Sequence, residues 1–331
     1  RRVARAAVGG GTPTLLEPDQ LERLFRLLHR FEVEGPACVE TSPSTATPDR
    51  LRVLQRHGVH RVSLGVQSFL EEETRALGRP QDPATLDCAL RNLQRCGFPS
   101  LNLDLIYGIP GQTAATWERS LREALAWQPQ ELYLYPLYVR PLTGLDRRPP
   151  GPDWDRQRLE LYRRGRDLLL SSGYRQLSMR HFSTTAQEDF GCQDDPMLGL
   201  GAGARSYTRR LHYSSEYAVS RAGVRAIVER FLTQDHQTAR HGVWLSQDEQ
   251  RRRWAIKTLL QVRGLDREAY MERFGADVLE HLPGLCELDG LLRREGRFLR
   301  LTDEGLERSD ALGPWLYSRE SRQRMEAYAW S

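Results

Sequence analysis

The sequence is almost devoid of lysine: Lys257 is the only one, although lysine and arginine together number 48. Arginine therefore carries nearly all the basic charge, and 44 acidic residues interspersed with it leave a net charge of only +4. Nucleic-acid binding needs a clustered basic surface, whereas mixed charges of this kind are typical of solvated faces. We expect no nucleic-acid partner.

Long apolar runs are also missing. No segment approaches the ~20 apolar residues that span a bilayer, and no secretory signal is visible. With 39% hydrophobic and 28% charged residues, the composition is typical of a soluble globular protein. We expect a cytoplasmic protein without a membrane partner.

Cysteines are few, odd in number and without metal-binding spacing. The five are Cys38, Cys88, Cys96, Cys192 and Cys286, and no CxxC or CxxxC pair occurs among them. An odd number without a secretory signal indicates reduced thiols rather than a disulfide framework. The sequence therefore predicts no metal or cluster site within this chain.

What the sequence does contain, beside its first apolar run, is a glycine-rich stretch. Val8 is followed by three glycines and then by Thr12, Pro13 and Thr14. Glycines leave the backbone uncovered, so another molecule can approach it closely. Alone, the motif is equally typical of an ordinary loop.

Strand-like and helix-like segments alternate from here at a period of roughly 30 residues, a pattern that predicts βαβ units and a parallel sheet. Such a sheet is either doubly wound or an incomplete barrel. The predicted strands are Ala4–Val8, Ala37–Thr41, Arg61–Gln67, Ser100–Tyr107 and Glu131–Leu137. The predicted helices are Pro18–Arg30, Pro48–His57, Leu70–Leu77, Pro83–Cys96 and a helix from the N-cap Thr113 to Trp127.

Polar residues stand at or just past the carboxyl end of every predicted strand. They are Gly11 and Thr12, Glu40 and Thr41, Gln67 and Ser68, Asp104, and Tyr135. In βα barrels this rim carries the site. One polar group on every strand favours a convergent site over chance.

The sequence changes character after Leu142. A long amphipathic helix is predicted over Trp154–Ser172, with Gly173 as its C-cap, and a further strand over Tyr174–Phe182. The glycine-rich segment Leu198–Tyr207 lacks the downstream acidic residue of a dinucleotide loop. It is interpreted as close backbone packing or a ligand-facing loop.

The C-terminal part has the outline of a winged helix. Ser246 and Glu249 predict a capping box for a helix ending near Val262. Helical segments over Asp266–Phe274 and Ala276–Leu292 precede a wing at Gly296–Leu301, with Thr302 as the next cap. Acidic residues on the helix before the wing disfavour duplex binding and favour a structural or lid role.

Six motifs in register carry a family resemblance. They are GGGTPT at 9–14, VETSP at 39–43, RVSLGVQSF at 61–69, LGR at 77–79, NLDLIYGIPGQT at 102–113 and GLGAGA at 199–204. Together they resemble the radical S-adenosylmethionine (SAM) family of oxygen-independent coproporphyrinogen III oxidases and haem chaperones. The resemblance implies an α/β fold: a partial (β/α)6 barrel over 1–145, a family-specific extension over 146–215, and a helical, winged-helix domain over 216–331.

The resemblance also implies a SAM site. Gly10, Gly11 and Thr12 would bind the methionine end, where exposed backbone groups suit its ammonium and carboxylate. Its other members would be Glu40, Gln67, Arg79, Asp104, and the apolar walls Ile106 and Leu137. Gln67 and Asp104 could instead satisfy buried backbone groups, and Arg79 could equally be a surface arginine. An unpaired carboxylate in an apolar strand is costly, which favours function for Asp104.

The family's three-cysteine motif follows its first barrel strand, and this sequence opens at Arg1 near the second. We therefore expect a truncated N-terminus, with the [4Fe–4S] ligands upstream of residue 1. The chain alone would then be inactive. The intact protein would use an electron donor and the cluster to cleave SAM to a 5′-deoxyadenosyl radical.

The middle of the chain departs from the family pattern, so the substrate, possibly a tetrapyrrole, stays open. Candidate substrate-facing residues are Arg140, Arg180, His181, Asp194, Asp195 and Arg205. Arg180 and His181 could equally be exposed polar residues beside a strand. Two alternatives to a radical SAM enzyme stay open: a haem chaperone on the same fold and a cluster-less scaffold.

Overall fold

The computed structural model describes residues 2–35, 37–139, 151, 153–185, 196–216, 218 and 220–327. These residues form two compact units. The first holds strands β1 to β9 with helices α1 to α6, and the second holds β10 to β15 with α7 to α13.

The first unit is built on a seven-stranded sheet in the order β2-β4-β5-β6-β7-β9-β8. Its strands are β2 (Ala6–Val8), β4 (Ala37–Thr41), β5 (Val59–Gln67), β6 (Ser100–Tyr107), β7 (Glu131–Pro136), β8 (Arg175–Gln176) and β9 (His181–Ser183). Neighbours from β2 to β7 pair parallel, and β9 pairs antiparallel with both β7 and β8. The predicted α/β fold with a largely parallel sheet is confirmed.

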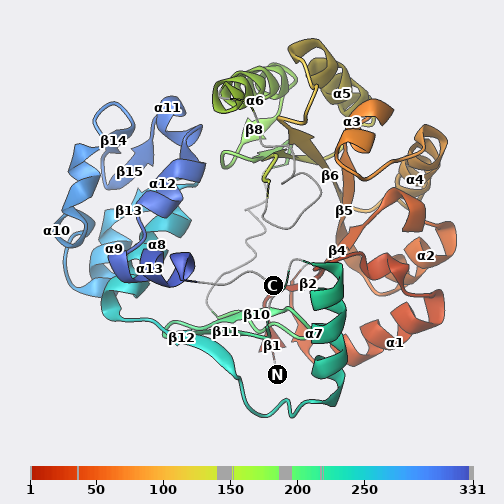
Figure 1. The fold of residues 1–331 in the computed structure, drawn as a ribbon, viewed down its shortest axis with the longest axis horizontal. Helices are drawn as coiled ribbons and strands as arrows, with labels where there is room; N and C mark the ends of the chain where they lie inside the picture. The colour runs from red at the N-terminus through yellow and green to blue at the C-terminus, as the bar shows by residue number, and fades with distance from the viewer. Residues whose placement is uncertain are drawn as a thin grey trace. The chain divides into compact units, whose positions relative to one another are not determined.

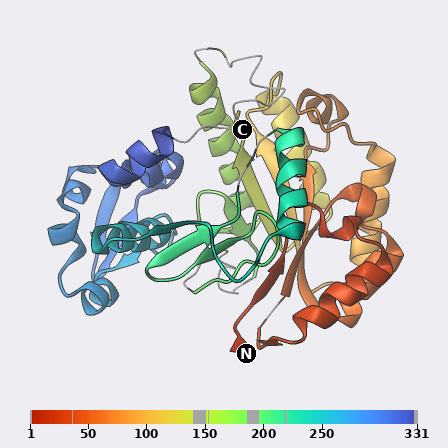
Figure 2. The same cartoon turned by 60° about the horizontal axis from the view of Figure 1, so that its bottom comes forward.

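Six helices follow the strands: α1 (Pro18–Leu28), α2 (Pro48–Arg56), α3 (Glu71–Ala76), α4 (Pro83–Cys96), α5 (Ala114–Ala126) and α6 (Trp154–Ser171), with short 3-10 turns at Pro13–Leu15 and Pro43–Thr45. Figures 1 and 2 show these helices along one side of the strands. Buried aromatic side chains pack these helices on the sheet: the ring centroids of Tyr107 on β6 and Trp117 on α5 lie 6.0 Å apart. Many of the side chains on the opposite side of the strands are polar.

The predicted elements of this unit are confirmed with one correction. Thr113 caps α5 as predicted, through its hydroxyl on the Thr116 N–H. The predicted strand Tyr174–Phe182 is wrong as one element, because the chain turns back between β8 and β9 and pairs them with each other. A two-stranded parallel sheet of β1 (Arg2–Val3) and β3 (Glu32–Val33) was not predicted.

The second unit contains two three-stranded antiparallel sheets, β10-β11-β12 and β13-β15-β14. The strands are β10 (Arg205–Tyr207), β11 (Leu211–Ser214), β12 (His241–Trp244), β13 (Leu265–Asp266), β14 (Leu292–Glu295) and β15 (Phe298–Leu301). The helices are α7 (Arg221–Thr233), α8 (Gln247–Leu259), α9 (Arg267–Phe274), α10 (Val278–His281), α11 (Asp303–Leu306), α12 (Ser309–Trp315) and α13 (Arg319–Glu326), with a 3-10 turn at Pro283–Glu287. One core of fully buried residues, including Leu259, Tyr270 and Leu299, joins helices α8 and α9 to β15.

The winged-helix outline holds, with two corrections. The helix predicted over Ala276–Leu292 is wrong, because α10 ends at His281 and Pro283 opens a 3-10 turn. Ser246 caps α8 as predicted, but Glu249 does not complete the capping box, since its carboxylate accepts from Ser321 at 3.0 Å.

The glycine-rich segment before β10 packs closely against its own chain. A Cβ on Gly199 would lie 2.4 Å from the carbonyl oxygen of Arg205, so only glycine fits there. This confirms the close-packing interpretation. The three-part division at residues 145 and 215 stays a prediction. No helix among the described residues has the length and apolar character needed to cross a bilayer.

Candidate functional site

The seven-stranded sheet has one apolar side and one polar side, set by the alternation of side chains along each strand. On β6, Leu103 and Leu105 are fully buried in phase with Tyr107, which packs on α5. Asn102 and Asp104 point to the other side. The register places Gly65 of β5 and Tyr133 of β7 on either side of Asp104. We call this other side the polar face.

The first glycines approach the polar face at Glu40. The Gly10 N–H donates to Glu40 Oε2 at 3.1 Å. A Cβ on Gly9 would lie 2.6 Å from the Glu40 carboxyl group, so a side chain there would displace that carboxyl group. Gly10 has a φ of +85°, which also favours glycine, and a Cβ on Gly11 would meet open space. The predicted uncovered backbone is therefore present.

Gln67 has unusual backbone geometry at the end of β5. Its φ is +69°, and the register with β6 shifts between Gly65 and Gln67. The side-chain Nε2 of Gln67 lies 2.7 Å from the position that a Cβ on Gly65 would take. Left-handed backbone at a non-glycine residue is costly and clusters at functional sites. The bulge and Gly65 together hold the amide against the polar face.

Asp104 lies in the middle of this face and is held by neutral donors. Its Oδ2 accepts from the Ser63 hydroxyl at 3.0 Å and its Oδ1 from the Asn102 amide at 2.8 Å. Burial raises the pKa of the Asp104 carboxyl, and the nearby charge of Glu40 adds to the rise. Burial likewise raises the pKa of Tyr135, with a further contribution from Asp104. Glu40, Asp104 and Tyr135 thus share one electrostatic environment.

A buried ion pair closes the polar face toward the amino ends of the strands. Arg61 Nη2 lies 2.8 Å from Glu131 Oε2, and His181 Nε2 lies 3.2 Å from the same oxygen. Burial alone would raise the pKa of Glu131, but the His181 hydrogen bond and the Arg61 charge outweigh it and hold that pKa at about 2. Cys38 accepts from Arg61 Nη1 at 3.0 Å.

An aromatic row continues this network along β7. The Tyr133 ring stacks on His181 at 4.3 Å and on Tyr135 at 5.8 Å, measured between centroids. The Arg180 guanidinium lies 5.9 Å from the Tyr135 ring and 5.4 Å from the Tyr138 ring, and it donates to the Tyr138 hydroxyl. Arg180 is therefore placed beside the polar face.

The strand-end residues predicted to converge divide between the two sides of the sheet. Glu40, Asp104 and Tyr135 lie on the polar face, together with Ile106, which follows Asp104 by two positions. Thr41 points to the helix side, where it bonds to Thr14 at 2.7 Å. Ser68 is likewise fully buried and donates to Glu73 at 2.7 Å. The expectation of one convergent set is wrong for Thr41 and Ser68.

The other SAM candidates have mixed positions. The Thr12 carbonyl accepts from the Leu15 N–H at 2.9 Å, so Thr12 ends the glycine stretch at a 3-10 turn. Leu137 is buried, and its N–H donates to the Tyr107 carbonyl at 2.8 Å. Arg79 is exposed, and no hydrogen bond or ion pair of its side chain to another candidate occurs within the described part of the chain.

The substrate candidates separate further. His181 is only 2% exposed, so its alternative interpretation as an exposed residue is wrong. Arg205 is exposed on β10 in the second unit. Arg140, Asp194 and Asp195 lie outside the described residues.

Sequence reasoning missed four members of the polar face: Arg61, Ser63, Asn102 and Glu131. A charged residue in a short strand resembles a surface residue when each strand is considered alone. The signal that could have found them is the period of two along a strand. Arg61 and Ser63 are an even number of positions from Gly65, and Asn102 is two positions from Asp104, so each pair shares a side of the sheet. Glu131 likewise opens its strand in phase with Tyr133 and Tyr135.

The polar face fits SAM better than the described cysteines fit an iron–sulfur cluster. Open backbone at Gly11 and carboxylates at Glu40 and Asp104 match an ammonium, a carboxylate and ribose hydroxyls. Cys38 is bound to Arg61, and among the residues that the structure describes no three His, Cys, Asp or Glu side chains gather as a metal site. The described cysteines therefore do not fit a [4Fe–4S] cluster.

Comparisons with known proteins place these features in a family. Residues 1–124 match the Radical SAM superfamily, and residues 245–307 match the HemN C-terminal domain. Oxygen-independent coproporphyrinogen III oxidase from Pseudomonas aeruginosa is 30% identical over 329 residues, covering 90% of this chain and 70% of the relative. Heme chaperone HemW from Escherichia coli is 33% identical over 214 residues, covering 62% of this chain.

The chain spans 56% of the length of that heme chaperone. The solved structure of coproporphyrinogen III oxidase (HemN) from Escherichia coli matches with a TM-score of 0.80 at 24% identity, covering 96% of this chain and 78% of that one. This match supports the fold. The chain belongs to the radical SAM superfamily and carries a HemN C-terminal domain, and oxygen-independent coproporphyrinogen III oxidases are among its homologues.

Proposed function

We propose that the polar face of the seven-stranded sheet binds SAM, and that the chain is the SAM-binding part of a radical SAM oxidoreductase. The observation that carries the proposal is the contact between the Gly10 N–H and Glu40 beside the open backbone of Gly11. Backbone N–H and C=O groups there suit the carboxylate and ammonium of an amino acid. Glu40 adds a negative charge that favours the ammonium.

The remaining contacts assign the rest of the cofactor. Asp104, held by Ser63 and Asn102, presents a carboxyl group of fixed orientation to ribose hydroxyls. Gln67, fixed by the bulge, supplies an amide that both donates and accepts. Ile106 adds an apolar contact on the same face. A [4Fe–4S] cluster would supply the electron for SAM cleavage, and we assign none of its ligands to the described residues.

For the substrate, we propose a tetrapyrrole or a related conjugated molecule, in line with the names of the homologues. Alignment with the oxidase covers 90% of this chain and alignment with the heme chaperone 62%, which favours the oxidase over the chaperone. Arg180 beside Tyr135 and Tyr138 offers a cation next to aromatic rings for an anionic planar ligand.

Titration calorimetry of the chain with SAM tests the proposal without requiring activity. Gly11→Val is the sharpest variant, because its Cβ meets open space and its backbone needs no left-handed φ. We expect saturable SAM binding that Gly11→Val weakens by at least about tenfold, through steric exclusion of the ligand from the backbone. The thermal unfolding midpoint should stay unchanged.

Gly151→Val is a matched control, since a Cβ at Gly151 also meets open space. Equal SAM affinity in wild type and Gly11→Val would contradict the site. Haem titration followed by the Soret band separates the chaperone alternative: stoichiometric haem binding with no SAM binding would overturn the enzyme proposal in favour of that alternative.

A further inference from the structure

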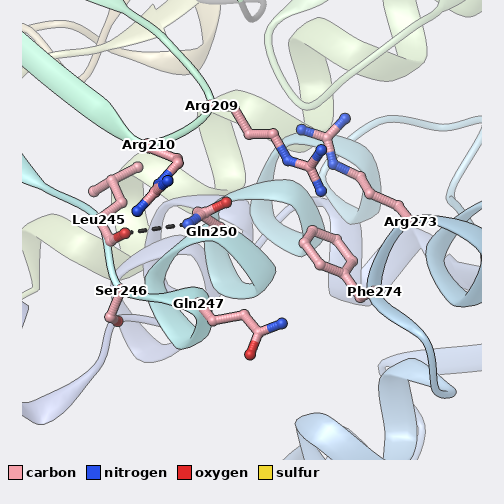
Figure 3. A pocket seen from close by; sticks show the side chains of 8 residues that line it. All are labelled: Arg209, Arg210, Leu245, Ser246, Gln247, Gln250, Arg273 and Phe274. Carbon is pink, nitrogen blue, oxygen red and sulfur yellow. Dashed lines mark hydrogen bonds between the residues drawn. The ribbon is translucent and has the colours of Figure 1, made fainter.

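The second unit contains a pocket of about 460 Å³ whose wall is rich in arginine (Figure 3). The residues come from the β10–β11 turn region, the end of β12, the start of α8 and the end of α9. They are Arg209, Arg210, Leu245, Ser246, Gln247, Gln250, Arg273 and Phe274. All of these residues except Arg209 and Arg210 lie in the HemN C-terminal match, so the pocket joins that domain to the preceding sheet.

Three exposed arginines gather in a pocket whose lining contains no carboxylate. No aspartate or glutamate lines the pocket, and within the described ranges no salt bridge involves Arg209, Arg210 or Arg273. Nearby arginines behave differently: Arg252 pairs with Asp248 at 2.7 Å and Arg267 with Asp277 at 2.8 Å. Like charges gathered without counter-charge repel one another, and a bound anion would relieve that repulsion.

The remaining polar groups on the wall also suit an anion. Ser246 caps α8, a helix of 13 residues, so the amino end of the helix lies beside the pocket. Two carboxylates stand in its first turn, but Asp248 is paired with Arg252 and Glu249 accepts from Ser321. The Gln250 amide donates to the Leu245 carbonyl at 3.1 Å, which occupies that acceptor. Phe274 contributes an aromatic surface beneath the guanidinium of Arg273, 5.6 Å from its ring centre.

The arrangement of the arginines and the size of the pocket indicate a ligand with more than one anionic group. Figure 3 shows the guanidinium groups of Arg209 and Arg273 turned toward each other, with Arg210 on another part of the wall. The volume lies within the range of small-molecule pockets. Guanidinium groups bind phosphate and carboxylate in the same two-pronged manner. We propose that this pocket binds a small polyanion carrying at least two phosphate or carboxylate groups, independently of the SAM site.

Calorimetric titrations of the full 331-residue chain with pyrophosphate and with citrate, at low salt, test this proposal. We expect saturable binding of at least one probe, weakened at least about tenfold in Arg209→Gln/Arg273→Gln, because each guanidinium makes charge-assisted hydrogen bonds. Pyrophosphate binding alone indicates a phosphate ligand and citrate binding alone a carboxylate ligand. This double variant should fold, since both side chains are exposed.

Arg119→Gln/Arg122→Gln is the matched control, because it removes the same charge from exposed positions of α5 in the first unit. The control should retain the affinity of the wild type. If both double variants weakened binding of the probe equally, the loss would follow from net charge alone, and the proposed site would be overturned. Absence of saturable binding to either probe would also overturn it, whatever the outcome of the SAM titration.

Discussion

The two sides of the seven-stranded sheet make opposite use of the same strands. On the helix side, Leu103 of β6 is fully buried and Leu134 of β7 packs beside Gly165 of α6. On the polar face, Asp104 and Tyr135 occupy the alternate positions of those strands. Period-two alternation therefore lets one sheet carry its core on one side and the proposed SAM site on the other.

The polar face is itself divided along the strands. Near the amino ends, Arg61 and His181 are buried, and each lies within 3.2 Å of the Glu131 carboxylate. Near the carboxyl ends, Gly11 and Glu40 are exposed. The buried end is an ion pair closed to solvent, whereas the exposed end is where we propose that SAM binds. Three substitutions sharpen this distinction.

The largest effect is expected for Glu131→Gln. Removing the carboxylate leaves Arg61 buried without its charge partner, which should cost about 3–5 kcal/mol of unfolding free energy. The native pKa of Glu131 is about 2, below its ordinary value of 4.5. The stabilisation is therefore fully present above pH ~4.5 and is lost as the pH falls toward about 2. Urea unfolding of both proteins across this range measures it.

The stability difference between wild type and Glu131→Gln should accordingly shrink as the pH falls. A difference that stays constant from pH 7 to pH 2.5 would contradict the role assigned to the ionised Glu131.

A somewhat smaller effect is expected for Leu103→Ala on the helix side. The substitution removes a fully buried side chain and leaves a cavity, which should cost about 3 kcal/mol of unfolding free energy. SAM affinity, measured below the unfolding transition, should stay within about twofold, because Leu103 points away from the polar face. Calorimetry measures the SAM affinity, and urea unfolding measures the unfolding free energy.

If Leu103→Ala weakened SAM binding as strongly as a change on the polar face, the assignment of the core to one side of the sheet and of the SAM site to the other would be wrong.

The smallest stability effect is expected for Asp104→Asn. Because burial raises the native pKa of Asp104, ionisation of this group opposes folding as the pH rises above its ordinary value of 3.8. At pH 7 the neutral amide should therefore change unfolding free energy by less than about 1 kcal/mol. SAM affinity should nevertheless fall by about tenfold, since an amide is a weaker acceptor for ribose hydroxyls than a carboxylate.

Leu103→Ala is its matched control on the same strand. A strongly destabilised Asp104→Asn with unchanged affinity would assign Asp104 to structure rather than to binding.

Strand and helix periodicity was sufficient to predict most of the first unit. β4, β6 and α4 have the predicted bounds, because each alternates or repeats clearly and is flanked by turn residues. The sheet β10-β11-β12 was missed because its strands are short and find their partners far along the chain: His241 of β12 pairs with Ser214 of β11. Local sequence carries little record of such pairing.

The sequence predicted the candidate SAM site only in outline. Glycine flexibility and strand-end polarity indicated Gly11, Glu40 and Asp104, but the same rule included Thr41 and Ser68, which turn to the helix side. The side on which a strand-end residue points depends on the strand's phase and on bulges such as the one before Gln67. Pairing across strands, as between Arg61 and Glu131, emerges only from the register.

Hydrogen–deuterium exchange of the chain with and without SAM tests the central claim most directly. The account predicts slower exchange on SAM binding in peptides covering Val8–Thr14 and Ala37–Ser42, because the ligand would cover the backbone of Gly10 and Gly11. Peptides covering the helix-side residues of α5 should be unchanged. Unchanged exchange over Val8–Thr14 at saturating SAM would contradict the assignment of the polar face as the SAM site.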